Sequence, residues 1–329
     1  MTIDRRGCLR ALACCAALLA LRAGAQDSTR VWRIGYLDQG AAARNRLYID
    51  ALRQGLHDLG WTDGRNIRIE ARFAEGRTDR LPKLAAELIE VPVDIMVTWS
   101  TPAALAAKHA SASIPIVIGF TADPVGSGIV ASLAHPGANI TGWTHIGLEL
   151  RAKYLELLKE ALPEASRIGV LWNPSNQVHQ PSLKVIEEAA QRLDVELVET
   201  GVQNPKDLEA AYAKWAEKRT QGIVVFPDGM FVAQMPLIVS LAARYRLPAM
   251  YGVREYVAAG GLMAYGANLA QMERKVGAAF VDKILRGAHP GDLPVAQPTK
   301  FELLLNGRTA RELGITLPAS LLVRADEVM

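Results

Sequence analysis

The residues best placed to do chemistry are short polar side chains that follow short apolar runs. Ser100 and Thr101 follow the run 95–97 and precede Pro102 and an alanine-rich stretch. A hydroxyl residue followed by proline and strong helix formers predicts a helix start. A strand that leads straight into such a helix leaves free backbone N–H groups at its carboxyl end, where open α/β sheets bind ligands and anionic groups are favoured. We therefore expect Ser100 and Thr101 to bind a ligand, with helix capping as the alternative role.

Similar side chains follow the other expected strands. The candidate ligand-binding residues are Asp38, Gln39, Ser100, Thr101, Thr121 and Asp123 in the first half of the chain, Asn173, Phe226, Asp228, Tyr251 and Glu255 in the second half, and Trp143 and Asn268 near the expected connections. Carboxylates and backbone N–H groups suit an α-amino and an α-carboxylate group, and the aromatic residues could cover an apolar side chain. Asp123 before Pro124 and Asp228 before Gly229 also fit simple turns.

Signals of catalysis or metal binding are weak. The six histidines are scattered, and none belongs to an H-E-x-x-H motif. The sequence holds no G-x-S-x-G elbow and no P-loop. Residues 126–131 spell G-x-G-x-x-A, but they follow the fourth expected strand, and the residues at 143–146, about 20 positions further on, include no acid, so we interpret the motif as a tight turn before a short helix. We expect a binding protein with no catalytic residue, no cofactor and no metal.

Composition indicates a two-domain globular protein without a nucleic-acid partner. The chain has 329 residues, of which 50% are hydrophobic, and a formal charge of +3. The first 25 residues hold four arginines and Asp4, so the remainder carries 33 basic and 33 acidic residues. No block of basic residues suggests a nucleic acid or a membrane surface.

The first 25 residues fit a cleaved signal peptide. Arg5, Arg6 and Arg10 precede the apolar stretch 12–21, and Ala23-Gly24-Ala25 fits a cleavage site. A retained anchor, a lipoprotein through Cys14 and a twin-arginine signal are weaker alternatives. All three cysteines, at positions 8, 14 and 15, lie in this segment, so the mature chain has no disulfide and no thiol nucleophile.

The mature chain alternates expected strands and helices in two sets. In the first set, strands at 33–37, 67–73, 94–100 and 114–120 alternate with helices at 45–60, 81–89 and 102–111. In the second set, strands at 167–171, 195–200, 222–226 and 248–253 alternate with helices at 181–193, 205–218 and 232–245. The first strands of the two sets, RIGYL at 33–37 and RIGVL at 167–171, differ at one position only. This alternation predicts two α/β lobes, each with a doubly wound parallel sheet.

Connections between the lobes are expected at three places. They are 139–143, 261–266 and the proline-rich stretch 290–297, with an amphipathic helix over 269–285 between the last two. We expect an N-terminal lobe of 31–142 with about 266–295 and a C-terminal lobe of 143–265 with about 296–329. About three crossovers between two similar lobes predict a hinged cleft.

Several motifs resemble the ABC-transporter substrate-binding protein family that includes the TrpX-like lipoproteins. They are DPVGSGIVASL at 123–133, PGANITG at 136–142, GYL at 35–37, TPAA at 101–104 and the tail from KFEL at 300–303 through LGITLP at 313–318 to RADEV at 324–328. The resemblance covers nearly all of 31–329. It implies a type I periplasmic-binding-protein fold with ligand between two lobes. The chain departs from the lipid-anchored members of the family because it lacks a convincing lipobox.

The resemblance implies a solute-binding component of an ABC importer. Its expected partners are a small polar ligand and an inner-membrane ABC permease with its ATPase, and we expect a monomer in the periplasm. The family resemblance implies an aromatic or branched amino acid as the first choice of ligand. A periplasmic ligand sensor for a signalling receptor is the alternative from another class, and a secreted α/β enzyme is a third.

Overall fold

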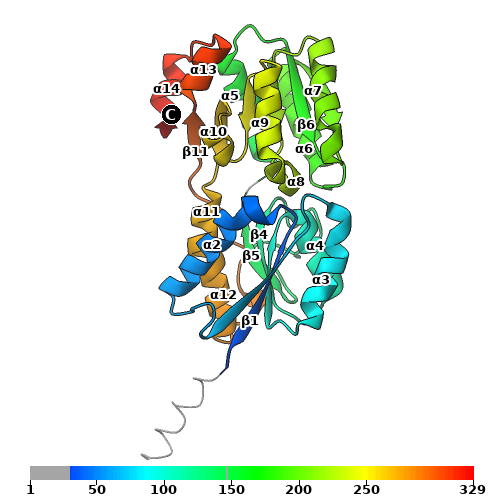
Figure 1. The fold of residues 1–329 in the computed structure, drawn as a ribbon, viewed down its shortest axis with the longest axis vertical. Helices are drawn as coiled ribbons and strands as arrows, with labels where there is room; N and C mark the ends of the chain where they lie inside the picture. The colour runs from blue at the N-terminus through cyan, green and yellow to red at the C-terminus, as the bar shows by residue number, and fades with distance from the viewer. Residues whose placement is uncertain (1–29, 146) are drawn as a thin grey trace, which may run out of the picture.

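The structure, a computed structural model, describes residues 30–145 and 147–329. These residues form two α/β lobes stacked along the long axis of the molecule (Figure 1). The signal segment expected at 1–25 lies outside the described residues. No helix among those described combines the length and apolar character needed to cross a membrane.

The N-terminal lobe is built on a five-stranded sheet. Its strands are β1 (Trp32–Asp38), β2 (Ile67–Phe73), β3 (Ile95–Trp99), β4 (Ile116–Thr121) and β5 (Ile140–Thr144). They lie in the order β2-β1-β3-β4-β5, and every neighbouring pair is parallel. The central strands β3 and β4 are buried along their whole length, as expected where helices cover both faces of a parallel sheet.

Helices from distant parts of the sequence cover this sheet. They are α2 (Ala42–Asp58), the 3₁₀ turn η1 (Thr78–Arg80), α3 (Leu81–Glu90), α4 (Thr101–Ala110), α11 (Leu269–Met272), the π-helical turn η3 (Glu273–Gly277), α12 (Ala278–Leu285) and the 3₁₀ turn η4 (Pro290–Asp292). α3 packs beside α4, whereas the late segment α11–η3–α12 packs beside α2 (Figure 1). The single helix expected over 269–285 is therefore interrupted by a π-helical turn, a feature common at functional sites.

The C-terminal lobe is built on a seven-stranded sheet in the order β12-β11-β10-β9-β8-β6-β7. Its strands are β6 (Arg167–Trp172), β7 (Glu196–Gly201), β8 (Gly222–Val225), β9 (Ala249–Tyr251), β10 (Met263–Gly266), β11 (Glu302–Leu305) and β12 (Glu327–Val328). Only the pair β10–β11 of these strands is antiparallel. The predicted fold class of two doubly wound parallel-sheet lobes is thus confirmed, with one antiparallel pair added near the end of the chain.

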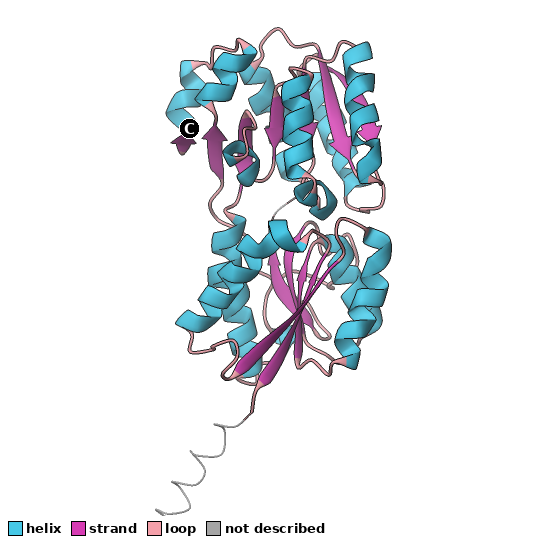
Figure 2. Cartoon of the chain, viewed as in Figure 1, coloured by secondary structure: helices cyan, strands magenta, loops and turns pink. Residues whose placement is uncertain are grey.

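The helices of the C-terminal lobe flank its sheet (Figure 2). They are α5 (Glu149–Ala161), α6 (His179–Arg192), the 3₁₀ turn η2 (Pro205–Asp207), α7 (Leu208–Glu217), α8 (Gly229–Ala233), α9 (Met235–Arg244), α10 (Glu255–Ala258), α13 (Gly307–Leu313) and α14 (Ala319–Arg324). α5 packs beside α6, and α7 packs beside α9. The helices α5, α10 and α14 were not predicted from the sequence.

The chain crosses between the lobes slightly later than the sequence patterns indicated. Residues 140–144 pair with β4, so the first crossing follows Thr144. Residues 263–266 form β10 in the second sheet, so the second crossing follows Gly266. The backbone N–H of Ala296 donates to the carbonyl of Gly142 at 2.9 Å, so the third crossing follows Ala296. Each range expected to be a crossing contains a short strand or a β-bridge that still belongs to a sheet, namely β5, β10 and the bridge at Ala296. The chain therefore leaves each lobe only after that strand or bridge ends.

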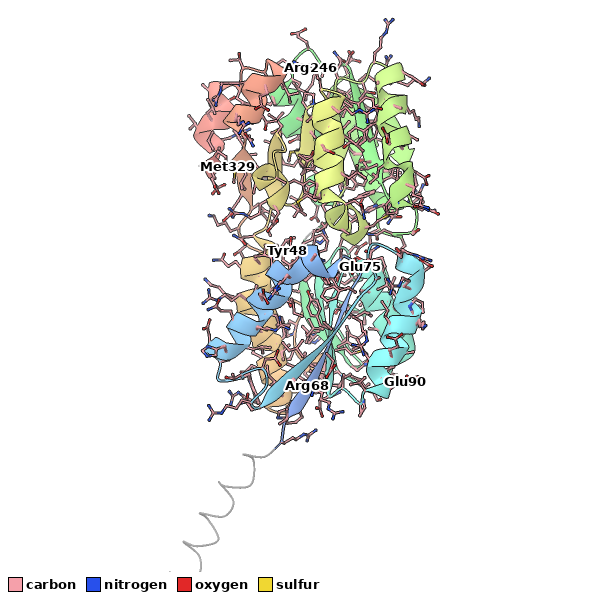
Figure 3. All side chains as sticks on the ribbon, viewed as in Figure 1. Tyr48, Arg68, Glu75, Glu90, Arg246 and Met329 are labelled. Atoms are coloured by element: carbon pink, nitrogen blue, oxygen red, sulfur yellow. The ribbon has the colours of Figure 1, made fainter. Side chains whose placement is uncertain are left out.

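The two lobes touch each other at the carboxyl ends of their parallel strands. Strands of both sheets run toward the boundary between the lobes (Figure 2). One apolar cluster continues across it, from Trp99 and Phe120 in the N-terminal lobe to Met230 and Tyr256 in the C-terminal lobe. Tyr48 lies at the edge of the lower lobe that faces the upper one (Figure 3). The region where ligand binding was predicted is therefore closed and largely buried.

Candidate ligand-binding site between the lobes

Asp38 ends β1 and is fully buried at the boundary. Its two carboxylate oxygens each accept a hydrogen bond from the Asn45 side-chain nitrogen at 2.8 Å, and one also accepts from the Gly40 backbone N–H at 2.6 Å. Burial raises the pKa of Asp38 to about 7, and these hydrogen bonds oppose the rise. Asp38 is thus held in place by its own lobe, and its carboxyl group keeps a proton to a higher pH than an exposed aspartate does.

Gln39 lies directly against the opposite lobe. Its side-chain nitrogen donates to the Thr78 hydroxyl at 2.9 Å, while its side-chain oxygen is buried without a hydrogen-bond partner among the described residues. A Cβ atom added to Gly229 of α8 would lie 2.8 Å from this oxygen. Gly229 therefore permits the close approach of the two lobes at this point.

Ser100 and Thr101 are both buried and both make hydrogen bonds within the lobe. Ser100 caps α4, because its hydroxyl accepts from the Ala103 backbone N–H at 3.3 Å. Its backbone has φ 113° and ψ 156°, a conformation that suits glycine. The Thr101 hydroxyl accepts from the Ala122 N–H at 3.2 Å and so ties α4 to the loop after β4. The capping role of Ser100 is observed directly, and ligand binding by either residue stays a prediction.

We expect two substitutions of Ser100 to have opposite effects on stability. Ser100→Ala removes the cap and keeps the positive φ, so it should lower the free energy of unfolding by about 1 kcal/mol. Ser100→Gly weakens the helix cap by only a few tenths of a kcal/mol and relieves backbone strain of order 1 kcal/mol or more, so it should raise the free energy of unfolding. Urea unfolding of both variants measures the difference. Equal stabilities of the alanine and glycine variants would contradict this account of the backbone.

Thr121 and Asp123 shape the loop after β4. The register between β4 and β5 shifts between Ile118 and Thr121, and Phe120 has a positive φ of 47°. Thr121 donates its hydroxyl hydrogen to the Gly119 carbonyl at 3.1 Å. Asp123 accepts from the Gly126 N–H at 2.8 Å, which makes the turn that its sequence allowed as an alternative. The irregular end of β4 aims Phe120 at the boundary between the lobes.

Four aromatic rings form a continuous row in the N-terminal lobe and its exit segment. Tyr48 stacks on Trp99 with centroids 4.3 Å apart, Trp99 stacks on Phe120 at 5.5 Å, and Phe120 meets His145 at 4.8 Å. We call these four residues the ring row. Trp143 meets Trp99 edge-on at 5.7 Å from the side of the sheet. The ring row offers flat apolar surface, which suits an apolar or aromatic ligand group.

Glu273 is a buried carboxyl group that the sequence did not reveal as part of the site. It lies in the π-helical turn η3, and one of its oxygens accepts from the Trp143 indole N–H at 2.9 Å. Its other oxygen is buried without a partner among the described residues. Burial raises the pKa of Glu273 to about 8, and the Trp143 hydrogen bond opposes this rise. The protonated carboxyl group is therefore the favoured form at neutral pH.

These shifts predict a stability that falls as the pH rises from about 6.5 to 8. The folded pKa values of Asp38 (about 7) and Glu273 (about 8) lie above the usual values of 3.8 and 4.5, so between these limits the native state binds more protons than the unfolded state. Burial lowers the pKa of His145 and of His179 from 6.5 to about 3, so the unfolded state binds more histidine protons than the native state, and this opposing contribution fades as the pH rises above 6.5. Toward pH 8 the carboxyl groups dominate, and the free energy of unfolding falls as Asp38 and Glu273 lose their protons.

Glu273→Gln should flatten this slope, because an amide keeps an acceptor for Trp143 and does not titrate. Denaturant unfolding at pH 6.5 and pH 8 gives the slope for each protein. Glu90→Gln, which changes an exposed glutamate at the far end of the same lobe (Figure 3), is the matched control and should keep the wild-type slope. Equal slopes for wild type and Glu273→Gln would show that Glu273 does not control the pH response.

The second lobe contributes a fully hydrogen-bonded carboxylate. Asp228 caps α8 by accepting from the Met230 N–H at 2.9 Å, and it also accepts from the side chains of Asn173 at 3.1 Å and Asn176 at 2.9 Å. Burial raises the pKa of Asp228, and these hydrogen bonds oppose the rise. His179 accepts from the Asn173 backbone N–H at 2.8 Å. Asn173 and Asp228 are thus brought together, as a support for the loops that face the N-terminal lobe.

The remaining predicted residues are spread around the boundary. Glu255 begins α10, has one buried oxygen without a partner among the described residues and contributes to the raised pKa of Tyr48, for which burial is the main cause. Asn268 caps α11 by accepting from the Gln271 N–H at 3.1 Å, at the second crossing. Glu255 therefore faces the N-terminal lobe, whereas Asn268 caps the N-terminus of α11.

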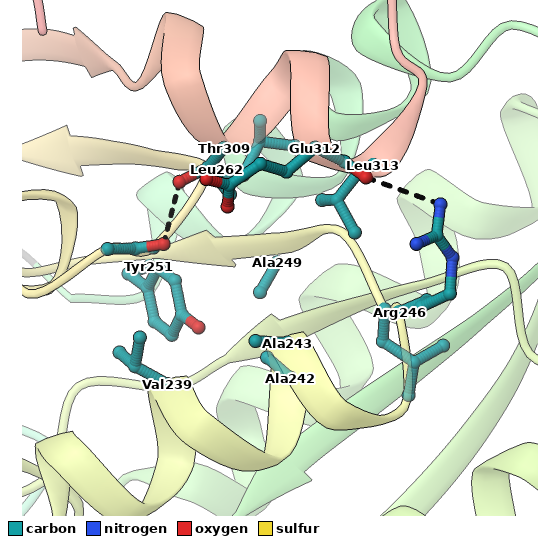
Figure 4. Close-up of a pocket in the computed structure, with 13 residues that line it drawn as sticks. Val239, Ala242, Ala243, Arg246, Ala249, Tyr251, Leu262, Thr309, Glu312 and Leu313 are labelled. Carbon is teal, nitrogen blue, oxygen red and sulfur yellow. Dashed lines mark hydrogen bonds between the residues drawn. The ribbon is translucent and has the colours of Figure 1, made fainter.

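Tyr251 lines a separate cavity within the C-terminal lobe. Its ring stacks on Tyr256 at 4.2 Å. The cavity of about 240 Å³ lies between α9 and α13, with Arg246 at one end and Tyr251 at the other (Figure 4). The structure thus does not bring Tyr251 to the ring row. Among residues 30–145 and 147–329, no group of three or more His, Cys, Asp or Glu side chains is arranged to hold a metal ion.

Sequence reasoning missed Arg151, which lies with Phe226 at the boundary. The guanidinium carbon of Arg151 is 4.8 Å from the centroid of the Phe226 ring, and both side chains are fully buried. A signal existed in the sequence: Arg151 takes a position in the apolar stripe of α5 that Tyr154, Leu155 and Leu158 continue. A charged residue in such a stripe indicates a buried charge, but α5 itself was not predicted.

The chain matches known proteins over most of its length. A family model described as ABC transporter substrate binding protein matches residues 44–329. A tyrosine-binding protein of Clostridioides difficile is 28% identical over 261 residues, which cover 79% of this chain and 74% of the relative.

Solved structures agree with this match. A conserved domain protein from Vibrio cholerae has a TM-score of 0.85 at 27% identity, covering 91% of this chain and 100% of that one. The ABC domain from Streptococcus pneumonia in complex with L-Trp has a TM-score of 0.83 at 24% identity, with the same coverage of both chains. With the family model covering most of the sequence, the chain belongs to the ABC transporter substrate-binding protein family.

Proposed function

We propose that the chain is the periplasmic solute-binding component of an ABC importer and that it binds a small polar ligand, foremost an aromatic amino acid, between its two lobes. The observation that carries this proposal is the meeting of strand ends from both sheets in one buried region. There Asp38 ends β1, Gln39 lies against Gly229 of the C-terminal lobe, and Asn173 and Asp228 support the opposing loops. Open α/β sheets bind ligands at such strand ends.

The ring row supports an aromatic ligand. Its four rings present flat surface at the boundary, and Phe226 lies on the other side. Two relatives add support from their own ligands, since one is described as tyrosine-binding and another was solved with L-Trp. A branched amino acid is the second choice, because the same apolar surface would accept it.

The proposed ligand site consists of residues at the ends of strands near the boundary between the lobes. From the predicted set we retain Asp38, Gln39, Ser100, Thr101, Thr121, Asn173, Phe226, Asp228 and Glu255 as its centre and Asp123, Trp143 and Asn268 as its periphery, and we leave out Tyr251 because it lines a separate cavity. The chain would perform no chemistry. In this proposal the ligand holds the lobes together, and the closed form docks on an inner-membrane permease as a monomer.

A thermal-shift screen followed by calorimetry tests the proposal. The mature protein, residues 26–329, is melted with amino acids, nucleosides and small carboxylates. A ligand present at 100 times its Kd stabilises the native state by about 2.7 kcal/mol, which raises the melting temperature by several degrees. L-tyrosine or L-tryptophan is expected to give the largest shift. A shift with nucleosides alone would contradict the proposed ligand class.

A further inference from the structure

Arg151 carries a buried charge that has no anionic partner in the described part of the chain. The side chain is fully buried, and neither Nη1 nor Nη2 has a hydrogen-bond partner among residues 30–145 and 147–329. Its Nε makes one long contact of 3.4 Å with the Ser182 hydroxyl. None of the ion pairs formed by the described residues includes Arg151. A guanidinium left in this state is costly, because burial removes its water without supplying an anion.

The surroundings of Arg151 supply aromatic faces. Its guanidinium carbon is 4.8 Å from the centroid of Phe226 and 5.4 Å from that of Tyr154. A Cβ atom added to Gly147 would lie 3.8 Å from Nη2. The flat guanidinium is therefore held in orientation by rings and kept close to the first crossing of the chain. Such stacking leaves the N–H edges of the guanidinium available to a ligand.

His145 adds a second unsatisfied group on the same side of the boundary. It is buried at the end of the ring row, and neither of its ring nitrogens has a hydrogen-bond partner in the described residues. Burial, and then the charge of Arg151, keep its pKa low, so the ring is neutral and carries one N–H donor. His145 lies beside Phe120 of the other lobe, and Arg151 is near enough for its charge to act on His145, so both residues offer N–H donors at this end of the ring row.

We propose that Arg151, assisted by His145, binds a carboxylate group of the ligand. This rests on the proposed function, namely that the ligand binds between the lobes. A planar carboxylate with two oxygens matches the fork of a guanidinium and can accept two parallel hydrogen bonds. A phosphate is less well matched, because one guanidinium would leave part of its charge of about −1.5 to −2 uncompensated in a buried site.

The proposal gives the buried region between the lobes two chemically different ends. At the far end of the ring row from His145, Tyr48 lies near Glu255, whose buried oxygen lacks a donor among the described residues. The end near Glu255 offers a hydrogen-bond acceptor, and the end near Arg151 offers hydrogen-bond donors. A ligand with a carboxylate at one end of a flat body and a hydrogen-bond donor elsewhere would satisfy both.

The test uses three aromatic probes that differ only in their charged groups. They are L-tyrosine, tyramine, which lacks the carboxylate, and 3-(4-hydroxyphenyl)propanoate, which lacks the amine. Calorimetry should show that the wild-type protein binds both acids at least about a hundredfold more tightly than tyramine, since a buried charge that loses its partner costs that much. Arg151→Met should lose this preference, and Arg151→Lys should keep part of it.

The melting temperature of the ligand-free variants gives a readout independent of any ligand. Because Met replaces an unpaired buried charge by an apolar chain of similar length, Arg151→Met should melt at or above the wild-type temperature. Arg65→Met, at an exposed arginine before β2, is the matched control and should change neither affinity nor melting. A lower melting temperature for Arg151→Met, with Arg151→Lys like wild type, would show that the charge serves the fold, and it would overturn the proposal.

The outcomes separate this inference from the proposed function. Equal binding of L-tyrosine and tyramine by the wild-type protein would overturn the role of Arg151 and leave aromatic ligand binding intact. If no aromatic probe binds, and small aliphatic carboxylates raise the melting temperature of wild type but not of Arg151→Met, the aromatic ligand class fails and the carboxylate role stands. Tight binding of L-tyrosine by Arg151→Met, within about threefold of wild type, would also overturn the inference.

Discussion

Replacing Gly142 by alanine is expected to destabilise the N-terminal lobe by about 3 kcal/mol or more. Gly142 lies in β5 with φ 137°, a conformation that strains any residue with a Cβ atom. A Cβ atom there would also lie 2.5 Å from the backbone nitrogen of Ile118 and against its carbonyl oxygen, and neither can move without breaking the β4–β5 pairing. Denaturant unfolding, followed by circular dichroism, measures the loss.

Gly128→Ala is the matched control for this prediction. Gly128 also has a positive φ, 68°, but a Cβ atom added there would meet no heavy atom within 4 Å. Its substitution carries the backbone strain alone, so a loss of about 1 kcal/mol is expected. If Gly142→Ala is no more destabilising than Gly128→Ala, the close packing of β5 on β4 is not as described.

Substituting Gly229 is expected to weaken ligand binding while leaving each lobe folded. A Cβ atom at Gly229 would lie 2.8 Å from the side-chain oxygen of Gln39 and 2.9 Å from its Cβ atom, so the added atoms collide with the other lobe. The arrangement in the structure contains this collision, and the opening of the lobes that we propose without ligand would relieve it. With an overpacking cost of about 1–3 kcal/mol, Gly229→Ala should reduce affinity for L-tyrosine about ten- to a hundredfold, and Gly229→Val should reduce it further.

The double variant Gln39→Ala with Gly229→Ala separates closure from direct ligand contact. If the collision is the cause, removing the Gln39 side chain restores part of the affinity lost in Gly229→Ala, and the two changes are strongly non-additive. Additive losses would mean that Gly229 affects the ligand by another route. Unchanged affinity in Gly229→Val would contradict the idea that binding closes the lobes at this point.

Much of the fold could be predicted because its signals are local. The runs RIGYL and RIGVL each begin a sheet, and the alternation of apolar strands with capped helices recurs in both lobes. Residues at strand ends, such as Asp38 and Asn173, could be named for the same reason, since parallel strands bring their carboxyl ends to one edge. The helix α5, over 149–161, was not predicted. Its N-cap residue is Leu148, which makes no side-chain capping bond, so the sequence lacks the polar N-cap residue that usually indicates a helix start.

The unpredicted parts of the site depend on contacts between distant segments. Glu273 reaches Trp143 only because the chain returns to the N-terminal lobe after its second crossing. Arg151 matters because both of its terminal nitrogens are buried without a hydrogen-bond partner among the described residues, which no spacing in the sequence reveals. His145 could be placed near a crossing from the sequence, but its lack of side-chain partners could not. Ser100 shows a further limit, since a hydroxyl at a helix start can cap, bind a ligand or do both, and only the structure shows the cap.

The central claim, that a ligand bound between the lobes closes them, is tested most directly by small-angle X-ray scattering of the mature protein. The measurement compares the protein alone with the protein saturated by L-tyrosine or L-tryptophan, with saturation established by calorimetry. Since the lobes are joined by three crossings and no sheet continues from one lobe into the other among the described residues, we expect a larger radius of gyration without ligand and a smaller one with it, the latter matching the closed arrangement. An unchanged radius of gyration at proven saturation would contradict the account.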